Sequence, residues 1–566
     1  MKKLLVVLLF AAPCLAGAQP AQPAQTDPLL DAMKAELGRS MGTLRAAEVS
    51  PLYYLAYEAY DKTSYSVSGQ AGTLYNDDFR RSRLLDVDVR IGSPDLDNTH
   101  EMKGREASNT KRQEAAALPV ENDPDALRSE LWNLTDKAYK AALDQYAKVK
   151  MNKSVTAEEE DKSNDFTPGE PHVFYEKAVF PDVDKEKFRA MVRRLSAKFK
   201  PYDFIYDADV RLAVDTVNRY MVNSEGAAIV TGNTYVRLIY SLYSRTADGM
   251  DLPRVKIYDS DGLRDLPDEA SIARDIDVSI AELKAQRAAA PEQPYSGPVL
   301  VESRAAGVFF HEILGHRLEG HRQKSEESGQ TFAKKVGQPI MPDFLSIYDD
   351  PSQYKLGSQF LRGFYRYDDE AMPAQKAVLV ENGVLKGFLM GRSPIKNFSA
   401  SNGHGRRSEG RGAVARMGNL VAVSSKTLPY KELRQRLIEE VKKAKKTYGL
   451  VVSDIAGGFT ITDRYLPQTF SVNVTMGYKV YADGRPDEPA RGLNLIGTPL
   501  QTFSRILVTG DDPAVFNGTC GAESGWVPVS SVSPSLLFSE METEKVQKSN
   551  AKPPVLKPPF ADKGGK

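Results

Sequence analysis

Two histidines and a glutamate stand together in the segment HEILGH at residues 311–316. His311 and His316 are five positions apart, and Glu312 directly follows the first histidine. Outside the predicted export segment the chain has one cysteine, Cys520. Imidazole nitrogens, a thiolate and a free carboxylate are the groups from which catalytic zinc sites are built. The pattern therefore predicts a metal centre that hydrolyses peptide bonds.

The spacing of the two histidines is one residue longer than in the common helical zinc motif. Five steps of about 100° place His311 and His316 roughly 140° apart on a regular helix. Both side chains reach one ion only if the helix bends, widens or ends between them. Gly315 directly precedes the second histidine, and we expect it to adopt an unusual backbone conformation that turns His316 toward the metal.

The same segment indicates a role for its carboxylate, but it supplies only two of the metal ligands. Glu312 follows the first ligand, where it is better suited to accept a proton from water at the ion than to bind the ion. The third ligand must come from elsewhere, and the candidates are Cys520, Glu319, His321, His404 and His172. Cys520 is favoured because a thiolate is the strongest zinc ligand among them. A buried core cysteine is the alternative.

A second group of polar residues lies in a glycine-flanked stretch at 403–407. His404, Arg406 and Arg407 could stabilise the oxyanion of a tetrahedral intermediate or bind a peptide carboxylate. The alternative, which we slightly favour, is a solvated loop with structural arginines. Glu319 could orient His316 as a hydrogen-bond acceptor, or it could be an ordinary surface carboxylate.

The composition limits the classes of partner. The chain has 566 residues, 41% of them hydrophobic, which suffices for two or more packed domains. Lysine and arginine number 75, as do aspartate and glutamate. A net charge of zero offers no electrostatic attraction for nucleic acid or an anionic membrane, so we expect neither as a partner.

The N-terminus has the pattern of a signal peptide. Lys2 and Lys3 precede an apolar run at 4–15, and Ala16-Gly17-Ala18 is a small-residue cleavage site. We expect cleavage after Ala18 and a periplasmic or secreted protein. A lipid anchor at Cys14 is disfavoured, because the residues before it depart from the lipoprotein pattern. No other segment reaches about 18 apolar residues, so no membrane span is expected.

Hydrophobic periodicity predicts an α+β fold, with an N-terminal α/β domain followed by a β-rich catalytic domain that carries the HExxxH helix. Helices are expected from Asp27, from Asp123, over 188–199, over 268–288, and over 430–448 with Gly449 as the stop. Strands are expected over 52–92, 205–247, 376–390, 413–424, 450–454, 469–482 and 502–509.

These elements suggest the following division of the chain. The predicted parts are a signal peptide at 1–18, a linker at 19–27, an N-terminal domain at 28–299 with a polar insertion near 93–175, a catalytic domain at 300–547, and a disordered tail at 548–566.

Several longer motifs resemble those of the TldD/PmbA family of zinc metallopeptidases. FFHEILGHRLEGH at 309–321 resembles the family's motif helix. In the same order follow the segments FAKKVGQPI (332–340), DDEAMPAQKAVLVENGVLKGFL (368–389), GHGRRSEGRGAVARMGNL (403–420), RGLNLIGTPLQTF (491–503) and NGTCG (517–521). VNSEG at 222–226 resembles the family's central strand and turn. The resemblance covers about 200–540.

The resemblance implies one Zn²⁺ per chain at His311, His316 and Cys520, with Glu312 as the catalytic carboxylate. It also implies cleavage of unfolded peptides bound along a strand edge, and assembly as a homodimer or a heterodimer with a family member. The export signal, the polar 93–175 region and the weakly matching first 200 residues depart from the family.

Two other functions compete with a peptidase. The chain could be a non-enzymatic subunit that binds peptides or stabilises a partner of the TldD/PmbA type. An intact HExxxH speaks against this, because a scaffold does not need a general base. A metal-handling protein is the third reading, and it would call for more histidines than the six in this chain.

Overall fold

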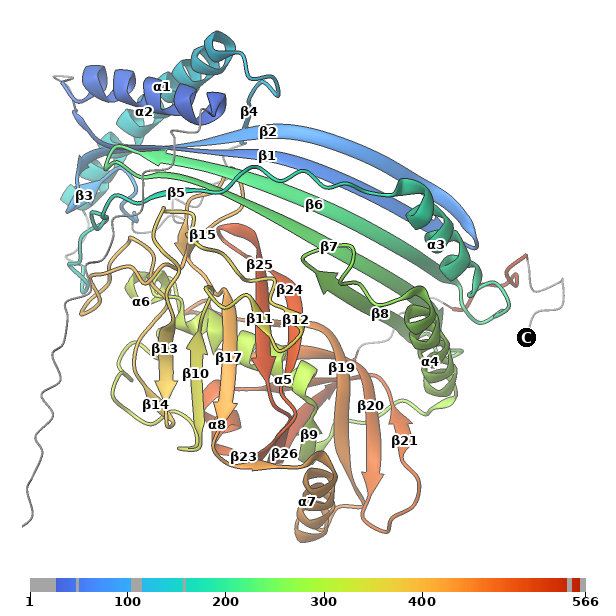
Figure 1. The fold of residues 1–566 in the computed structure, drawn as a ribbon. Helices are drawn as coiled ribbons and strands as arrows, with labels where there is room; N and C mark the ends of the chain where they lie inside the picture. The colour runs from blue at the N-terminus through green and yellow to red at the C-terminus, as the bar shows by residue number, and fades with distance from the viewer. Residues whose placement is uncertain (1–26, 47–49, 103–114, 156–158, 547–551, 560–566) are drawn as a thin grey trace, which may run out of the picture.

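The computed structural model describes residues 27–46, 50–102, 115–155, 159–546 and 552–559. The predicted signal peptide and nearly all of the predicted linker lie outside these residues. Among the described helices, none combines the length and the apolar character that a bilayer crossing requires. The mixed α+β architecture that the periodicity predicts is confirmed (Figure 1).

The N-terminal half is built on one strongly curved sheet that arches over the rest of the molecule (Figure 1). Its strand order is β3-β2-β1-β6-β7-β5, with β4 beside β2 and β8 beside β7. All of these pairs are antiparallel except β5 with β7. The strands are β1 (Leu52–Gln70), β2 (Thr73–Ser93), β3 (Leu96–Asp97), β4 (Ala116–Ala117), β5 (Val173–Tyr175), β6 (Asp207–Asn223), β7 (Ala228–Arg245) and β8 (Asp251–Ser260).

Helices cover the two ends of this sheet. They are α1 (Pro28–Leu44) and α2 (Pro124–Val155) at one end, and α3 (Lys185–Ala197) and α4 (Glu269–Ala288) at the other. The helix α1 begins where the sequence indicates, because Asp27 accepts hydrogen bonds from the backbone of Leu29 and Leu30 while Pro28 occupies the first turn. The predicted helices α2, α3 and α4 are likewise confirmed.

The C-terminal half contains a closed barrel and a second sheet. In the barrel β9 pairs with both β19 and β26, so the ring β9-β19-β20-β22-β26 closes on itself. The six-stranded sheet has the order β14-β13-β10-β17-β25-β24. The barrel strands are β9 (Ser296–Val301), β19 (Tyr448–Thr460), β20 (Phe470–Tyr481), β22 (Leu493–Gly497) and β26 (Leu536–Lys545). The sheet strands are β10 (Leu345–Asp349), β13 (Ala377–Glu381), β14 (Val384–Leu385), β17 (Asn419–Ser424), β24 (Ala514–Ala522) and β25 (Gly525–Ser533).

Helix α5 (Ser303–Ile313) lies between these two sheets (Figure 1), and it is buried along most of its length. It contacts β24 and β25 on one side and β19 and β20 on the other. Phe309 is fully buried and meets Phe470, Phe503 and Phe538 edge-on. This packing holds the motif helix between the barrel and the six-stranded sheet. The strands that contact it come from segments far apart in the sequence.

Smaller elements complete this half: η2 (Gly315–Leu318), α6 (His321–Lys324), β11 (Lys355–Leu356), β12 (Gln359–Phe360), β15 (Gly405–Arg406), β16 (Val414–Ala415), β18 (Thr427–Leu428), α7 (Tyr430–Lys443), β21 (Glu488–Ala490), α8 (Pro499–Ser504) and β23 (Ile506–Gly510). The domain boundaries stay predictions. The strand β9 already belongs to the barrel, however, and it begins before residue 300.

The structure corrects two element predictions. The helix expected over 430–448 ends at Lys443, and Lys445 takes a left-handed conformation with φ of 53°. Gly449 lies in β19, where a Cβ would come within 2.9 Å of the Leu437 side chain, so it serves packing rather than termination. The strand expected over 502–509 begins only at Ile506, because Pro499 opens the helix α8.

The disorder of the tail at 548–566 stays a prediction; its residues 552–559 are described, and Lys557 lies 3.2 Å from Asp203. The strand expected over 376–390 is limited to β13 and β14.

Buried ion pairs join the two halves. Arg219 on β6 donates to Glu58 on β1 at 2.9 Å and to Asp369 at 2.5 Å. Arg407 donates to Glu58 at 2.8 Å through its guanidinium and to Asp369 at 2.6 Å through its backbone. Asp86 on β2 borders this network and accepts a hydrogen bond from the Gly410 backbone. The curved sheet is thereby fixed to the loops of the C-terminal half.

Replacement of Asp86 by asparagine should change how stability depends on pH. Burial raises the pKa of Asp86 to about 6, against the opposing charge of Arg407 and with the support of Glu58 and Glu409. The folded protein therefore holds this proton up to about pH 6, whereas the unfolded chain releases it near the ordinary pKa of 3.8. As the pH rises through this interval, the free energy of unfolding of the wild type should fall by up to about 3 kcal/mol.

Chemical denaturation at pH 4 and pH 7 measures the effect. The free energy of unfolding of Asp86→Asn relative to wild type should rise between the two pH values. Asp136→Asn, on the exposed face of α2, is the matched control. A difference between Asp86→Asn and wild type that stays constant with pH would refute the assignment.

Candidate metal centre

The first histidine and the glutamate lie in the last turn of α5, and the second histidine lies beyond its end. The helix stops at Ile313, and Leu314 departs from helical geometry with φ of −120° and ψ of −53°. His316 then belongs to the short 3-10 helix η2. Because the helix ends between them, the two imidazoles face each other with ring centroids 5.0 Å apart.

Gly315 acts differently from the prediction. Its φ is not in the left-handed region, so the expected unusual backbone conformation is wrong. A Cβ at this position would lie 2.0 Å from the Met417 sulfur, so glycine is required by space. Met417 thus packs directly against the chain where it leaves α5.

Cys520 joins the two histidines from β24, about two hundred residues further along the chain. Its Sγ lies 3.2 Å from His311 Nε2 and 3.3 Å from His316 Nε2. The three ligand atoms all lie within 4.8 Å of one another. The residues are 7%, 7% and 5% exposed. Three potential ligands from three separate elements therefore converge in a nearly closed space.

The donor set fits zinc. Zinc binds imidazole nitrogen at about 2.0 Å and thiolate at about 2.3 Å in tetrahedral sites, which separates such ligand atoms by roughly 3.5 Å. The observed separations of 3.2 and 3.3 Å are close to that value. Three protein ligands leave the fourth position of a catalytic zinc site for water or substrate.

Charges around the cysteine favour its ionised form. Burial opposes ionisation of the thiol, but His316 and His311 outweigh it, so the pKa of Cys520 is well below its ordinary value. Arg416 adds a hydrogen bond to the sulfur at 3.1 Å. A low thiol pKa is what a metal-ligating thiolate requires.

A buried carboxylate holds the second histidine. Glu319 Oε1 lies 3.2 Å from His316 Nδ1, which leaves Nε2 facing Cys520. Glu319 is fully buried, and its charge is balanced by Arg322 at 2.8 Å and Arg416 at 3.2 Å. Burial would raise the pKa of Glu319, but His316 and Arg322 lower it to about 2. Of the two readings of Glu319, the structure supports the one in which it orients His316.

Glu312 stands beside the trio without a partner of its own. Its side chain is buried, and its carboxylate makes no hydrogen bond or ion pair with any residue that the structure describes. Gly458 on β19 lies against it, since a Cβ there would come within 2.7 Å of Glu312 Cγ. Gly457 and Gly458 lie in a bulged part of β19, and the strand approaches the glutamate closely there.

The other candidates for a third ligand lie elsewhere or are already bonded. His404 is fully buried with its Nε2 3.2 Å from Asp349. His172 lies against the Tyr367 ring. His321 pairs with Glu523, and Arg322 bridges Glu523 and Glu319, so a cation already occupies that cluster.

The residues proposed for substrate or transition-state contacts have structural partners. Arg406 donates to the carbonyl oxygens of Met417 at 2.6 Å and Pro528 at 2.7 Å. Arg407 belongs to the ion-pair network between the two halves, and His404 is paired as described above. None of these bonds involves the metal trio or Glu312, and the loop is buried rather than solvated.

Sequence reasoning missed Arg416, Arg322 and Ser531. Arg416 contacts both Cys520 and Glu319, and Ser531 Oγ lies 3.5 Å from His311 Nδ1. An arginine set between Ala415 and Met417 in an apolar stretch was the one available signal, because a buried arginine needs a buried partner.

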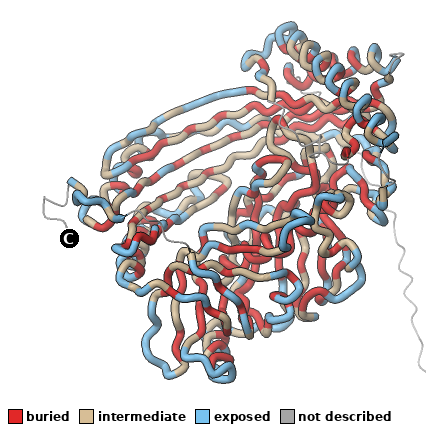
Figure 2. Tube along the Cα trace, turned by 180° about the vertical axis from the view of Figure 1, so that it is seen from behind, coloured by how far each residue is buried: buried red, intermediate tan, exposed pale blue. Residues whose placement is uncertain are grey.

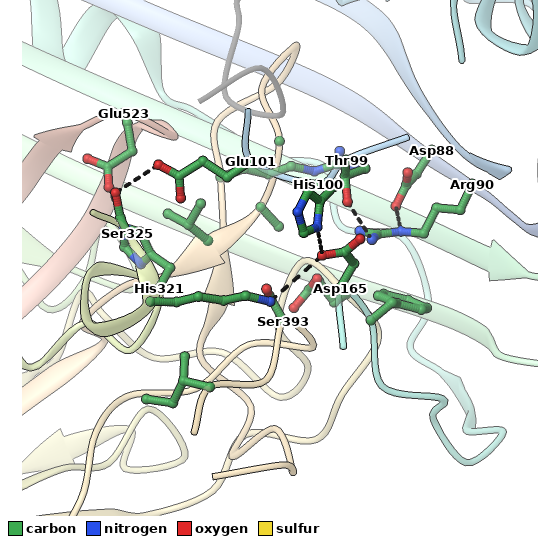
Figure 3. A pocket seen from close by; sticks show the side chains of 18 of the residues that line it. Asp88, Arg90, Thr99, His100, Glu101, Asp165, His321, Ser325, Ser393 and Glu523 are labelled. Atoms are coloured by element: carbon green, nitrogen blue, oxygen red, sulfur yellow. Dashed lines mark hydrogen bonds and ion pairs between the residues drawn. The ribbon is translucent and has the colours of Figure 1, made fainter. Parts of the chain in front are cut away.

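A large cleft opens next to this centre, between the two halves of the molecule. Its volume is 2110 Å³, and its walls come from the N-terminal sheet and α2 on one side and from loops of the C-terminal half on the other. Figure 3 shows His321, Ser325 and Glu523 at one end of it and His100, Asp165 and Arg90 at the other. Glu523 follows Cys520 by three residues, so the cleft reaches the neighbourhood of the metal ligands.

Comparisons with known proteins find similarity in the second half of the chain. Residues 294–545 match the family model described as the PmbA/TldA metallopeptidase C-terminal domain. A "Metalloprotease" of Methanothermobacter thermautotrophicus is 28% identical over 311 residues, which cover 54% of this chain and 63% of the relative. A "Zinc metalloprotease TldD homolog" of Saccharolobus solfataricus is 25% identical over 245 residues, covering 43% and 51%.

The fold as a whole also has a solved counterpart. The crystal structure of TldE from Thermococcus kodakarensis superposes with a TM-score of 0.59 and covers 91% of this chain and all of that one. At 16% identity this likeness concerns the fold alone. The sequence matches, by contrast, span only about half to two thirds of the curated relatives' length.

Metal content should depend on the trio and not on the neighbouring histidine. Protein purified with zinc should hold close to one ion per chain, and His311→Ala and Cys520→Ala should each bring the content near zero. His321→Ala is the matched control, because His321 lies ten residues from His311 and pairs with Glu523. Atomic absorption on dialysed protein measures the ratio. Full zinc content in Cys520→Ala would return the search to another third ligand.

Proposed function

We propose that this chain, whose residues 294–545 match the PmbA/TldA metallopeptidase C-terminal domain, belongs to the TldD/PmbA family and is a zinc-dependent endopeptidase acting on unfolded or flexible peptides. One observation carries the proposal: two imidazoles and a sulfur converge, and the residue that directly follows the first histidine is a buried glutamate whose carboxylate has no partner in the described chain. The metalloprotease names of its relatives support the same chemistry.

The residues that would hold zinc are His311, His316 and Cys520. A zinc ion bound there supplies Lewis acidity, which polarises a peptide carbonyl and makes water more acidic. Glu319 fixes the orientation of His316 through Nδ1, and Arg416 keeps the Cys520 sulfur anionic by donating to it. These contacts leave the ligand nitrogens and the sulfur directed toward a common point.

Glu312 would act as the general base and then as the general acid. Its carboxylate has no competing donor, so it is available to accept a proton from attacking water. The same oxygen can return that proton to the leaving amine as the peptide bond breaks. Burial beside Gly458 excludes bulk water from the carboxylate and restricts its rotamers.

Strand edges near the centre support binding of extended peptides. Cys520 lies on β24, the last strand of the six-stranded sheet, which has no further strand on its outer side in the described chain. An extended peptide can add to such an edge through backbone hydrogen bonds, which tolerates many sequences. We therefore propose unfolded peptides as the substrate class.

The remaining parts of the proposal concern place and assembly. We propose export to the periplasm or the medium through the N-terminal segment at 1–18, with cleavage after Ala18. We also propose that the chain works with a second chain, either a copy of itself or a family member. The alternative to catalysis, a subunit that binds peptides without cutting them, differs in one measurable respect, the need for Glu312.

Glu312→Gln should separate metal binding from catalysis. The amide keeps the size of the side chain but cannot accept the proton, so cleavage of an unfolded substrate such as reduced casein should fall by about 10²- to 10⁴-fold. Zinc content should stay at the wild-type level. Glu327→Gln, on the wall of the adjoining cleft, is the matched control and should cut normally. If the zinc-loaded wild type binds casein and never cuts it, the non-enzymatic alternative holds.

Gly458→Ala should displace the Glu312 carboxylate through a contact from β19. The added Cβ would lie 2.7 Å from Glu312 Cγ and 2.9 Å from the Ser471 carbonyl oxygen, so Glu312 must move. We expect activity to fall at least tenfold while zinc content and the melting temperature change little. Gly42→Ala, on α1, where a Cβ meets nothing within 4 Å and φ is not left-handed, is the control for a glycine far from the site. Unchanged casein cleavage in Gly458→Ala would show that Glu312 tolerates displacement.

A further inference from the structure

The strand β2 leaves a long part of one edge without a partner. Its inner edge pairs with β1 along the whole strand. On the outer edge β4 pairs at Leu84 and Leu85, and β3 pairs at Gly92 and Ser93. Among the residues that the structure describes, no strand pairs with the outer edge of residues 73–82. An open edge presents backbone donors and acceptors that can pair with another strand.

This edge also exposes large side chains. Tyr75 is 62% exposed and Phe79 is 52% exposed. Figure 1 shows β2 as the outermost strand of the arch, and Figure 2 shows much of that margin as exposed. Exposed aromatic side chains on an open edge are a feature that monomeric proteins usually avoid.

When a second copy of this strand runs antiparallel to the first, the charges on the two strands are opposite in sign at facing positions. The sequence from residue 75 to residue 83 is Tyr-Asn-Asp-Asp-Phe-Arg-Arg-Ser-Arg, with Phe79 at its centre. Reversal about Phe79 sets each aspartate against an arginine: position 78 against 80, and position 77 against 81. The outer positions then set Asn76 against Ser82, and the pairing ends before Arg83, whose carbonyl oxygen already accepts a hydrogen bond from Leu118.

We propose that residues 76–82 of β2 pair antiparallel with the same residues of a second copy of this chain, with Phe79 opposite the partner's Phe79. The two curved sheets then form one continuous sheet across a two-fold axis. The contact is isologous, as most homodimer interfaces are. Each copy satisfies the open backbone edge of the other.

The outward face of the sheet receives the matched charged pairs, because on the other face Asp77 already pairs with Arg189 and Arg81 with Asp61. Cross-strand neighbours show that Phe79, Asp77 and Arg81 lie on the face covered by α3, since Phe79 is opposite Tyr65 and both rings lie near Lys185. On that face the two Phe79 rings meet each other. On the opposite face lie Asp78 and Arg80, which are opposite Ser66 and Ser64 of β1.

The outward pair Asp78 and Arg80 is available for such a contact. Within one chain they form an ion pair, but the Arg80 side chain is 80% exposed and that of Asp78 is 38% exposed. An exposed pair of this kind contributes little to the stability of a single chain. Across the dimer each Asp78 faces the partner's Arg80, which gives two matched pairs where opposite charges lie directly across from each other.

A second copy explains the pattern better than protection against aggregation does. Protective edges carry charges of one sign or prolines, so that two copies repel each other. Residues 76–82 contain neither a proline nor an excess of like charges at facing positions. Their arrangement attracts only a strand with the reversed order of charges, which a copy of this chain provides.

A charge swap tests the pairing. Asp78→Arg and Arg80→Asp each place like charges across the interface at both symmetric positions. Each should raise the dissociation constant of the dimer about tenfold or more, measured by sedimentation velocity. Mixing the two variants restores both pairs in the heterodimer, so the mixture should assemble like the wild type. Native mass spectrometry identifies the heterodimer. Asp136→Arg and Lys140→Asp, an exposed ion pair on α2, form the matched control and should leave assembly unchanged.

A cysteine scan tests the register independently. Directly opposite residues of antiparallel strands have Cα atoms about 4.5–5.5 Å apart, within the range of a disulfide. Phe79→Cys should therefore form a disulfide-linked dimer on mild oxidation. In Ser82→Cys the two cysteines would lie about 20 Å apart along the strands and should not cross-link. Cys520 is buried, and the wild type controls for its reaction.

Three results would overturn the proposal. One is a wild-type protein that stays monomeric at micromolar concentration. Another is a dimer that tolerates both charge reversals separately and shows no preference for the mixed pair. The third is equal cross-linking of Phe79→Cys and Ser82→Cys. None of these measurements depends on peptidase activity.

Discussion

The structure depends on the approach of one sulfur to two imidazoles. Cys520 comes from the edge strand β24, whereas His311 and His316 come from the end of α5 and the short η2. These elements meet because α5 is packed between the barrel and the six-stranded sheet. The termination of the helix at Ile313 matters equally, since a continued helix would direct His316 about 140° away from His311.

Buried charge accompanies this approach. Arg416 contacts the sulfur and also Glu319, and Arg322 contacts Glu319 from another side. Each charge is costly to bury alone, but the chain of opposite charges compensates the loss of water. The ring nitrogens of His316 are thereby divided, with Nδ1 toward Glu319 and Nε2 toward Cys520. These buried groups preorganise the site.

The sequence predicted much of the fold and the central group of the site. Capping at Asp27 and the alternation in 205–247 are local signals, so α1, β6 and β7 follow directly from them. The end of α7 was misjudged because Lys445 takes a left-handed conformation without being glycine, and the start of β23 was misjudged because Pro499 opens the helix α8 in the region expected to be a strand. The closure of the barrel through β9 and β26 depends on pairing of residues some 240 positions apart, which no local pattern reveals.

The site also contains residues that the sequence indicated and features that it could not reveal. Residue types and spacing indicated His311, Glu312, His316 and Cys520, which the structure brings together. Spacing could not reveal that Gly315 is needed for the packing of Met417, or that Arg406 and Arg407 face inward to structural partners. X-ray absorption at the zinc edge of the metal-loaded protein tests the central claim most directly. The account predicts one sulfur neighbour at about 2.3 Å and nitrogen or oxygen neighbours at about 2.0 Å. A spectrum without a sulfur neighbour would contradict it.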